Sequence, residues 1–406
     1  MEKIVVNGGK PLYGKIKIQG SKNAALPLIF ATVAMHGVSV IDNVPDIGDV
    51  RCALDIVASF GAEIERSADR VIINTEKLLY KSPDTTLVSK LRASTYLIGA
   101  CLARFGVAEL MSFGGCNFGN RPIDMHIASA CAMGADKIGD RLCSPRLIAT
   151  EIELHKPSVG ATINTLIMAS SAIGTTVIKG AAKEPHVSSL VCFLRSGGAK
   201  IREDKDSLIV EGNELSGGYA KVIPDMIEAG TYLLLSPLLG GQVGVEFDAL
   251  SHLSSYLGTL CAGGINAFLD SGCLHLDGAL LRPIEIATGP YPEFPTDLQP
   301  QLAPLMARYF GGSITENVWQ DRFGYLTSLA QFGLRYERES NKARIFRSSL
   351  CAGEAIATDL RGGAACLLTA LTASGVSSIY NPGVILRGYS DLCKNLTSIG
   401  ADVKIV

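Results

Sequence analysis

Two hydrophobic patterns alternate along this chain. In the first, nearly every residue of a segment of about three helical turns is apolar, which predicts a helix buried on all sides. In the second, apolar and polar residues alternate over four or five positions, which predicts a half-buried strand. Most of the apolar segments are followed by a glycine and then by such a strand. The six apolar segments are 24–35, 93–103, 161–173, 230–239, 298–310 and 362–374.

A second glycine marks a repeat. A helical segment ends at Gly61, Gly134, Gly198, Gly264, Gly333 and Gly400, at intervals of 64 to 73 residues, and an alternating strand follows each glycine. Glycine is the usual residue where a helix ends in the left-handed conformation. The chain therefore consists of six similar repeats, each with two helices and several strands, and three repeats make a domain of ordinary size.

Length and composition agree with two domains and exclude several classes of protein. A chain of 406 residues exceeds what one hydrophobic core usually serves. The formal charge of −2 gives no general attraction to nucleic acid or to an anionic membrane. Its 11 cysteines form no Cys-x-x-Cys pair or zinc-binding cluster with histidine, so we expect reduced thiols, no metal and a cytoplasmic location.

No membrane span or export signal is expected. The N-terminus lacks the apolar core and cleavage site of a signal peptide. The long uncharged stretches 157–178 and 362–386 are interrupted by Gly, Ser, Thr, Asn or Pro. Each fits a buried helix followed by a strand better than a transmembrane helix.

Polar residues gather where the six buried helices begin. Ser, Thr, Asp and Asn are expected there as N-caps. The cations Lys22, Arg92 and Arg361 are not, because a positive charge near a helix N-terminus is unfavourable without an anion nearby. An anionic ligand, phosphate above all, would explain them. The residues concerned are Ser21, Lys22, Asn23, Lys90, Arg92, Lys156, Ser158, Asp225, Glu228, Thr296, Asp297, Thr358, Asp359 and Arg361.

Cys116 lies in a glycine-rich segment, Gly114–Pro122, with Arg121 five residues downstream. A nearby guanidinium favours the thiolate, so this cysteine could exchange a proton or attack carbon. It could equally be a small apolar residue in a turn. His126 similarly fits either a ligand contact or a structural role.

The segment Gly9–Lys15 imitates a phosphate-binding P-loop, but Ile16 stands where the magnesium-binding Ser or Thr belongs. A β-hairpin between strands 4–6 and 16–18 is the expectation here.

Several longer motifs resemble those of the UDP-N-acetylglucosamine 1-carboxyvinyltransferases, the enolpyruvyl transferases that begin peptidoglycan precursor synthesis. The resemblance extends from the first strand to the last repeat. Cys116 and Asn23 favour this family over the related shikimate-pathway enzymes, which typically have Ser-Lys-Ser at the first motif and lack the cysteine loop. The matching segments are 20–27, 90–94, 114–124, 158–162, 294–299, 357–361 and 387–389.

The resemblance implies an α/β fold of two domains, an inside-out α/β barrel with six βαβαββ-type repeats, three per domain, in which helices are buried and sheets lie outside. It implies a first domain of residues 22–223, and a second of residues 1–21 with 224–406. The active site is expected in the cleft between them, with no metal and no cofactor.

The family transfers the enolpyruvyl group of phosphoenolpyruvate to the 3'-hydroxyl of UDP-N-acetylglucosamine and releases phosphate. By resemblance, Cys116 is the general acid and a candidate for a covalent adduct, and Asp297 is the candidate base. The residues expected to contact phosphoenolpyruvate are Lys22, Asn23, Arg121, Arg361 and Arg387, of which Lys22, Arg121 and Arg387 are also assigned to catalysis. The residues expected to contact the UDP-sugar are Arg92, Arg121, Pro122, Ile123, Asp124, Met125, Lys156, Ser158, Val159, Asp297 and Val318.

The sequence departs from the family pattern at three places. Leu386 replaces an aspartate before Arg387, Met226 replaces an arginine, and residues 186–189 differ from the usual acidic motif. Two alternatives therefore stay open: a paralogue that uses another hydroxylated acceptor, and a catalytically silent UDP-sugar-binding protein.

Overall fold

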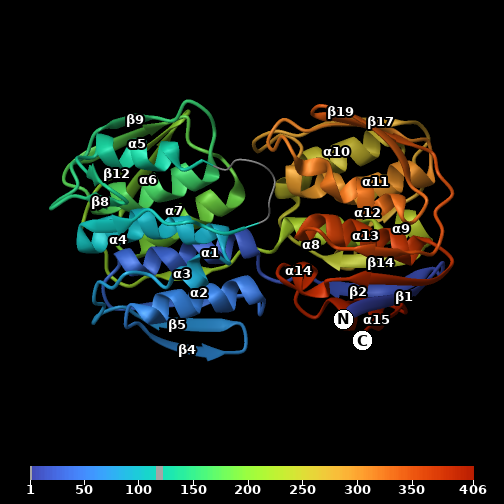
Figure 1. The fold of residues 1–406 in the computed structure, drawn as a ribbon, viewed down its shortest axis with the longest axis horizontal. Coiled ribbons are helices and arrows are strands. Elements are labelled where there is room, and N and C mark those ends of the chain that lie inside the picture. The colour runs from blue at the N-terminus through green and yellow to red at the C-terminus, as the bar shows by residue number, and fades with distance from the viewer. Residues whose placement is uncertain (1, 116–121) are drawn as a thin grey trace. The chain divides into compact units, whose positions relative to one another are not determined.

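The computed structural model describes residues 2–115 and 122–406, so Cys116 and Arg121 lie outside the described residues. The chain divides into two units, each with its own hydrophobic core (Figure 1). We call residues 20–115 with 122–223 the N-terminal unit, and residues 2–19 with 224–406 the C-terminal unit. The chain passes between them at Gln19–Gly20 and again at Ile223–Pro224.

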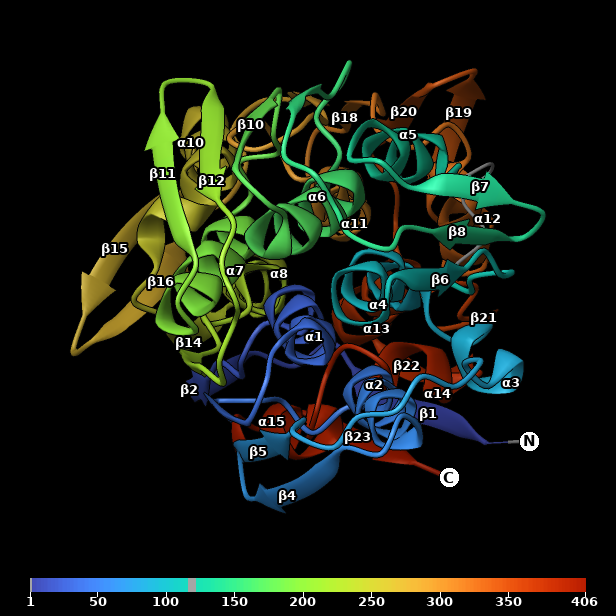
Figure 2. The ribbon, with the colours of Figure 1, turned by 90° about the vertical axis from the view of Figure 1, so that its left-hand side faces the viewer.

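The described part of the N-terminal unit contains three sheets with helices between them, as Figure 2 shows for α1, α4, α6 and α7. Its strands are β3 (Val38–Asp42), β4 (Glu63–Ser67), β5 (Arg70–Asn74), β6 (Val107–Glu109), β7 (Asp136–Ile138), β8 (Arg141–Cys143), β9 (Glu151–Glu153), β10 (Thr175–Lys179), β11 (Lys200–Asp204), β12 (Ser207–Glu211) and β13 (Tyr219–Lys221). Its helices are α1 (Lys22–Ala31), η1 (Thr32–Ala34), α2 (Gly48–Ser59), α3 (Thr85–Val88), η2 (Arg92–Tyr96), α4 (Leu97–Phe105), α5 (Asp124–Ala132), α6 (Val159–Ser171) and α7 (Pro185–Ser196), where η denotes a 3₁₀ helix.

The C-terminal unit repeats this plan with three sheets of its own. Its strands are β1 (Lys3–Gly8), β2 (Leu12–Lys17), β14 (Gly241–Glu246), β15 (Asn266–Asp270), β16 (Cys273–Asp277), β17 (Ile284–Ala287), β18 (Gly312–Thr315), β19 (Arg335–Glu339), β20 (Lys342–Phe346), β21 (Glu354–Ile356), β22 (Gly375–Tyr380) and β23 (Asp402–Ile405). Its helices are α8 (Met226–Leu233), α9 (Leu235–Leu239), η3 (Leu250–Leu253), α10 (Ser254–Gly263), η4 (Thr296–Leu298), α11 (Gln299–Arg308), η5 (Arg322–Gly324), α12 (Tyr325–Ala330), α13 (Leu360–Thr372), α14 (Pro382–Leu386) and α15 (Leu392–Ser398).

Five of the six described sheets have four strands and one pairing scheme. Reading across each sheet, the first pair is parallel and the next two are antiparallel, as in β17-β18-β20-β19. The sixth sheet, β6-β8-β7, keeps only the two antiparallel pairs. This common scheme confirms the six repeats and the expected α/β fold.

The prediction of a hairpin between β1 and β2 is wrong. β1 pairs antiparallel with β22 and β23, whereas β2 pairs parallel with β14 in another sheet. Alternation of apolar residues identifies a strand but not its partner, and all three partners here come from far along the sequence. The first two strands thus complete sheets of the C-terminal unit.

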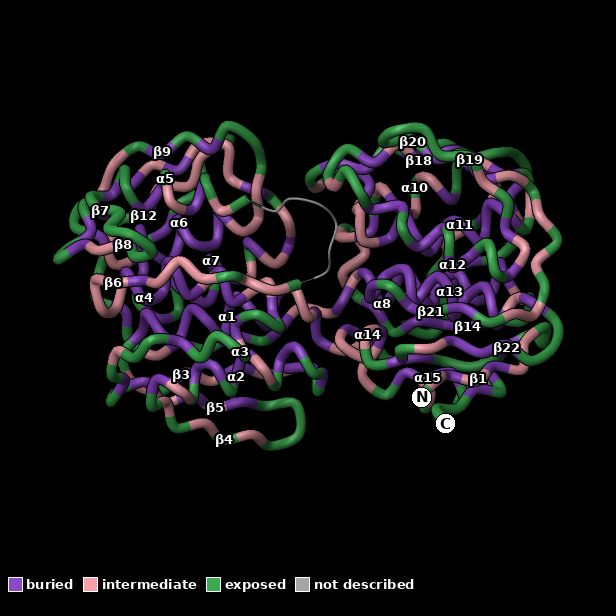
Figure 3. Tube along the Cα trace, in the orientation of Figure 1, coloured by how far each residue is buried: buried purple, intermediate pink, exposed green. Residues whose placement is uncertain are grey.

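The central helices are buried around their whole circumference, as the purple segments of Figure 3 show. In α13 every residue except Thr372 is buried, and α6 is buried from Ala161 to Ser170. Buried helix starts need hydrogen-bond acceptors for their first amides, and Asn164, inside α6, supplies one. Its Oδ1 accepts from Gly99 N at 2.6 Å, which satisfies one of the amides left unpaired in the first turn of α4.

The helix predicted over 230–239 is instead two short helices, α8 and α9, separated by Leu234. Pro237 lies in α9 and has no amide to donate to the preceding turn, so it interrupts the regular helical bonding. Within the described residues, no helix is long and apolar enough to cross a membrane.

The six repeat-marking glycines all have the left-handed backbone that the sequence predicts, with φ between 82° and 111°. At Gly400 an added Cβ would meet nothing within 4 Å, so backbone strain alone decides the effect of a substitution there. Gly258 offers a control in the same unit, because it lies inside α10, has no positive φ and is equally uncrowded.

We therefore expect one substitution to have opposite effects at these two positions. Gly400→Ala should lower the free energy of unfolding by about 1–2 kcal/mol, because L-residues resist the left-handed region. Gly258→Ala should raise it by about 0.5–1 kcal/mol, because alanine favours a helix interior. Denaturant unfolding of both variants measures this. Equal changes of the same sign would contradict the prediction.

Candidate active site

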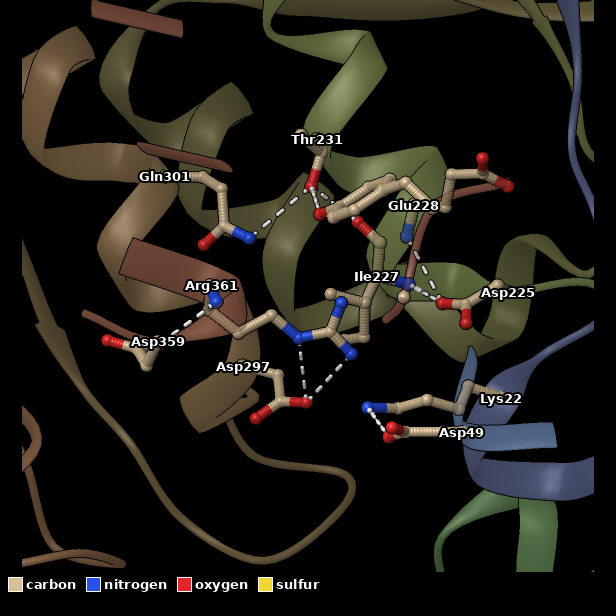
Figure 4. Close-up of polar contacts among 12 residues, drawn as sticks. Lys22, Asp49, Asp225, Ile227, Glu228, Thr231, Asp297, Gln301, Asp359 and Arg361 are labelled. Atoms are coloured by element: carbon tan, nitrogen blue, oxygen red, sulfur yellow. Dashed lines mark hydrogen bonds and ion pairs between the residues drawn. The ribbon is translucent and has the colours of Figure 1, made fainter. Parts of the chain in front are cut away.

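In the C-terminal unit, Asp297 contacts two buried arginines, Arg322 and Arg361; Figure 4 shows its contact with Arg361. Its Oδ1 accepts from Arg322 Nη2 at 2.9 Å, and its Oδ2 accepts from Arg361 Nε at 3.1 Å and from Arg361 Nη2 at 3.0 Å. The two arginines are only 3% exposed, whereas the side chain of Asp297 is 26% exposed. Two guanidinium groups therefore fix one partly accessible carboxylate in position.

Arg361 comes from the first turn of α13, where its backbone N–H donates to the capping side chain of Asp359. Burial alone would lower the pKa of Arg361, but the charge of Asp297, with Tyr389 and Asp225, outweighs burial and raises it. Its Nη1 is buried and has no hydrogen-bond partner in the part of the chain that the structure describes. A buried guanidinium that lacks a bond costs free energy unless a ligand supplies an acceptor.

Glu316 holds the surroundings of Asp297 in place. Its Oε1 accepts from Thr288 Oγ1 at 2.7 Å and from the backbone amides of Val318 and Trp319 at 2.8 Å and 3.0 Å. Its Oε2 accepts from the hydroxyl of Thr296 at 2.8 Å. One buried carboxylate thus fixes both the residue before Asp297 and the backbone of Val318.

In the N-terminal unit, Lys22 opens α1 and pairs with Asp49 of α2. Lys22 Nζ lies 3.2 Å from Asp49 Oδ2, and both side chains are largely buried, at 13% and 7% exposure. Asp49 supplies the negative charge that a cation at a helix N-terminus requires. Part of the argument for an anionic ligand is therefore weakened, because Asp49 already balances the charge of Lys22.

His126 lies where three predicted UDP-sugar segments converge. Burial first, and then the charge of Arg92, lower its pKa to about 4, while Asp124 opposes the shift. A Cβ added to Gly160, in the first turn of α6, would come within 2.9 Å of its ring. The starts of η2, α5 and α6 are therefore neighbours.

The His126 ring is neutral near pH 7 and has one preferred tautomer. Its Nδ1 lies 2.7 Å from Asn164 Nδ2, which also donates to Thr95 O. Because Asn164 Oδ1 is used by Gly99, its amide nitrogen faces the ring, and the ring proton is assigned to Nε2.

The other sequence-predicted residues occupy ends of helices or loops. Asn23 is the second residue of α1, Ser158 caps α6 by accepting from Ala161 N, and Val159 begins that helix. Arg387 caps the C-terminal end of α14 and is half-buried. Met125 is buried, Ile123 is half-buried, and Pro122, Lys156 and Val318 are exposed. Cys116 and Arg121 lie outside the described residues, so their roles stay predictions.

Among the described residues, no group of three or more His, Cys, Asp or Glu side chains could hold a metal ion.

Comparisons with known proteins relate this arrangement to a family. The family model for EPSP synthase (3-phosphoshikimate 1-carboxyvinyltransferase) matches residues 6–396 of the sequence. The chain belongs to the EPSP synthase family. Among curated relatives of this family member, the UDP-N-acetylglucosamine 1-carboxyvinyltransferase of Halothermothrix orenii is 39% identical, over 100% of both chains. UDP-N-acetylglucosamine 1-carboxyvinyltransferase 2 of Clostridium acetobutylicum is also 39% identical, over 100% of this chain and 99% of the relative.

Solved structures confirm the fold of this family member. The enolpyruvyl transferase NikO from Streptomyces tendae has a TM-score of 0.90 at 24% identity, and covers 100% of this chain and 99% of its own. An EPSP synthase from Acinetobacter baumannii has a TM-score of 0.73 at 17% identity, over 100% of both chains.

Sequence reasoning missed Arg322, Glu316 and Asp49. Arg322 follows Gln320 and Asp321 in an irregular polar stretch that resembles a surface loop, so nothing signals its burial. Glu316 directly follows β18, and Asp49 opens an amphipathic helix, where an acidic residue is expected for local reasons.

Glu228, at the start of α8, should make the stability of the protein depend on pH. Burial first, and then the charge of Asp225, raise its pKa well above 4.5, against the opposing effects of the Gln19 amide and Arg361. The folded protein therefore favours the neutral carboxyl group up to a higher pH than the unfolded chain does. Stability from this group is complete below pH 4.5 and is lost as pH rises toward the raised pKa.

Glu228→Gln should remove this loss. The free energy of unfolding of the variant, relative to the parent, should increase between pH 5 and 7 by up to about 1.4 kcal/mol per pH unit. Urea unfolding at three pH values in that range measures the difference. A difference that does not change with pH would show that Glu228 is ionised in the folded protein.

Proposed function

We propose that this protein transfers the enolpyruvyl group of phosphoenolpyruvate to the 3'-hydroxyl of UDP-N-acetylglucosamine and releases phosphate, the first committed step of peptidoglycan precursor synthesis. Full-length relatives at 38–39% identity that carry the name of this activity support the proposal. The observation that carries it in the structure is Asp297, held by Arg322 and Arg361 with one Arg361 nitrogen still lacking a partner.

Phosphoenolpyruvate carries a phosphate and a carboxylate, so its binding requires several cations and hydrogen-bond donors. Lys22, Arg121, Arg361 and Arg387 supply the cations, and Asn23 supplies an amide beside Lys22. The same charges stabilise the negative charge that develops as the carbon–phosphate oxygen bond breaks.

The reaction needs two proton transfers in its addition step. Cys116 gives a proton to the methylene carbon of phosphoenolpyruvate, while Asp297 orients the 3'-hydroxyl and accepts its proton as oxygen bonds to the adjacent carbon. Elimination then removes a proton from the new methyl group and expels phosphate, which restores the double bond. Glu316 keeps the Asp297 segment rigid through Thr296.

The UDP-sugar is assigned to helix starts of the N-terminal unit and to two residues of the C-terminal unit. Backbone amides at a helix N-terminus favour the diphosphate, and Ser158 and Val159 open α6. Arg92 and Lys156 add charge, Arg121–Met125 adds polar and apolar contacts, and Asp297 and Val318 complete the set.

Two of the three departures from the family pattern place an apolar residue against a hydrophobic core. Met226 and Leu386 are half-buried and pack against the core of the C-terminal unit. Apolar residues at these two positions therefore add packing to the C-terminal unit. All cysteines among the described residues are free, which supports a cytoplasmic location.

The proposal predicts acceptor-dependent phosphate release. In the presence of phosphoenolpyruvate, the purified protein should release one phosphate per UDP-N-acetylglucosamine consumed. It should release little phosphate when 3-phosphoshikimate or UDP-glucose is the acceptor. Cys116→Ser should abolish or sharply lower the release, because a hydroxyl is a far weaker acid than a thiol. A coupled phosphate assay measures both.

Each other outcome replaces part of the proposal. Release only with another acceptor would make the protein a paralogue of different specificity. UDP-sugar binding without turnover of any acceptor would make it a silent binding protein. Full activity of Cys116→Ser would remove Cys116 from the acid role.

A further inference from the structure

Gln19 is the last residue of the first segment of the C-terminal unit, directly before the chain passes to the N-terminal unit. Its backbone is fixed at both polar atoms. The amide N–H donates to Glu228 Oε2 at 2.9 Å, and the carbonyl accepts from Asp225 N at 2.9 Å. Since both partners belong to the start of α8, Gln19 has a fixed position relative to that helix.

The side chain of Gln19 reaches a different segment. Its Nε2 donates to Gly388 O at 2.7 Å, and its Oε1 accepts from the backbone N–H of Ser390 at 3.0 Å and from the Ser390 hydroxyl. One amide group thus bonds the backbone at two points, as a neighbouring strand would. The bonded residues lie one and three positions after Arg387.

The opposite side of this turn is also held. Tyr389 is buried, and its hydroxyl lies 2.9 Å from Thr231 Oγ1 of α8. A Cβ at Gly388 would approach Leu360 within 2.6 Å, so the backbone there packs closely on α13. Of these contacts, only those of the Gln19 amide join the backbone of the turn at residues 388–390 to the end of segment 2–19.

We propose that Gln19 is a positioning residue for Arg387. The inference rests on the proposed role of Arg387 as a phosphoenolpyruvate contact. A guanidinium binds a small anion well only if its backbone is already ordered. Otherwise the free-energy cost of ordering the turn on binding lowers the affinity. Gln19 holds that backbone through Gly388 and Ser390.

The test compares substrates rather than stability alone. Gln19→Met in the full-length protein keeps the side-chain length but removes all three side-chain hydrogen bonds. The KM for phosphoenolpyruvate should rise about tenfold, the effect of losing about one hydrogen bond to a buried group. The dissociation constant for UDP-N-acetylglucosamine should change less than twofold. Gln242→Met, at an exposed position of β14, is the matched control and should behave like the parent.

A second, more conservative variant shows whether misfolding explains the change in KM. Gln19→Glu keeps an acceptor for Ser390 but places a carboxylate oxygen against Gly388 O, so its KM for phosphoenolpyruvate should also rise. An unchanged KM in the folded Gln19→Glu and Gln19→Met variants would overturn the positioning role. Equal losses for both substrates would do the same, since they would indicate a general structural role.

Arg387→Ala, measured alongside, separates this inference from the proposed function. A raised KM for phosphoenolpyruvate in Arg387→Ala with an unchanged KM in Gln19→Met overturns only the role of Gln19. An unchanged KM in Arg387→Ala overturns the assignment of Arg387, and the role of Gln19 with it.

Discussion

The fold depends on one constraint: helices buried on every side must satisfy the polar groups at their own N-termini. Asp225, Asp359 and Ser158 do so as caps for α8, α13 and α6. Unpaired amides in a buried first turn would be costly, so each start attracts polar side chains. The candidate chemistry of this protein follows from that requirement. Arg361 and Lys22 stand at such starts, and each also needs a carboxylate, which Asp297 and Asp49 provide.

The ion pair of Asp297 and Arg361 has a consequence for function. Asp297 is kept in one orientation by two arginines, while its own side chain stays partly accessible. Arg361 in turn keeps one nitrogen that no described residue engages. A purely structural ion pair would gain from closing that last bond, because a buried unsatisfied donor is destabilising. The open donor beside an oriented carboxylate is the arrangement expected of a site for an anionic substrate.

Much of the fold could be predicted from the sequence, because it depends on local signals that repeat. Gly61 and its five counterparts marked helix ends correctly, and the apolar segments marked the buried helical regions, although segment 230–239 contains parts of two short helices. Strand partners could not be predicted, since β1 and β2 pair with strands more than 200 residues away. In the candidate site, Asp297 and Arg361 were found through motifs, whereas Arg322 and Glu316 were missed. Their importance depends on burial and on contacts between distant segments, which no local pattern records.

The central claim is that the Asp297–Arg361 pair belongs to a substrate site rather than to the scaffold alone. The most direct test is the KM for phosphoenolpyruvate of Arg361→Lys at saturating UDP-N-acetylglucosamine. Lysine keeps the charge but has one nitrogen instead of a planar set of three, so it cannot keep the paired bonds to Asp297 while a separate nitrogen faces an anion. The account predicts a rise of at least tenfold in a variant that remains folded. An unchanged KM in that variant would contradict it.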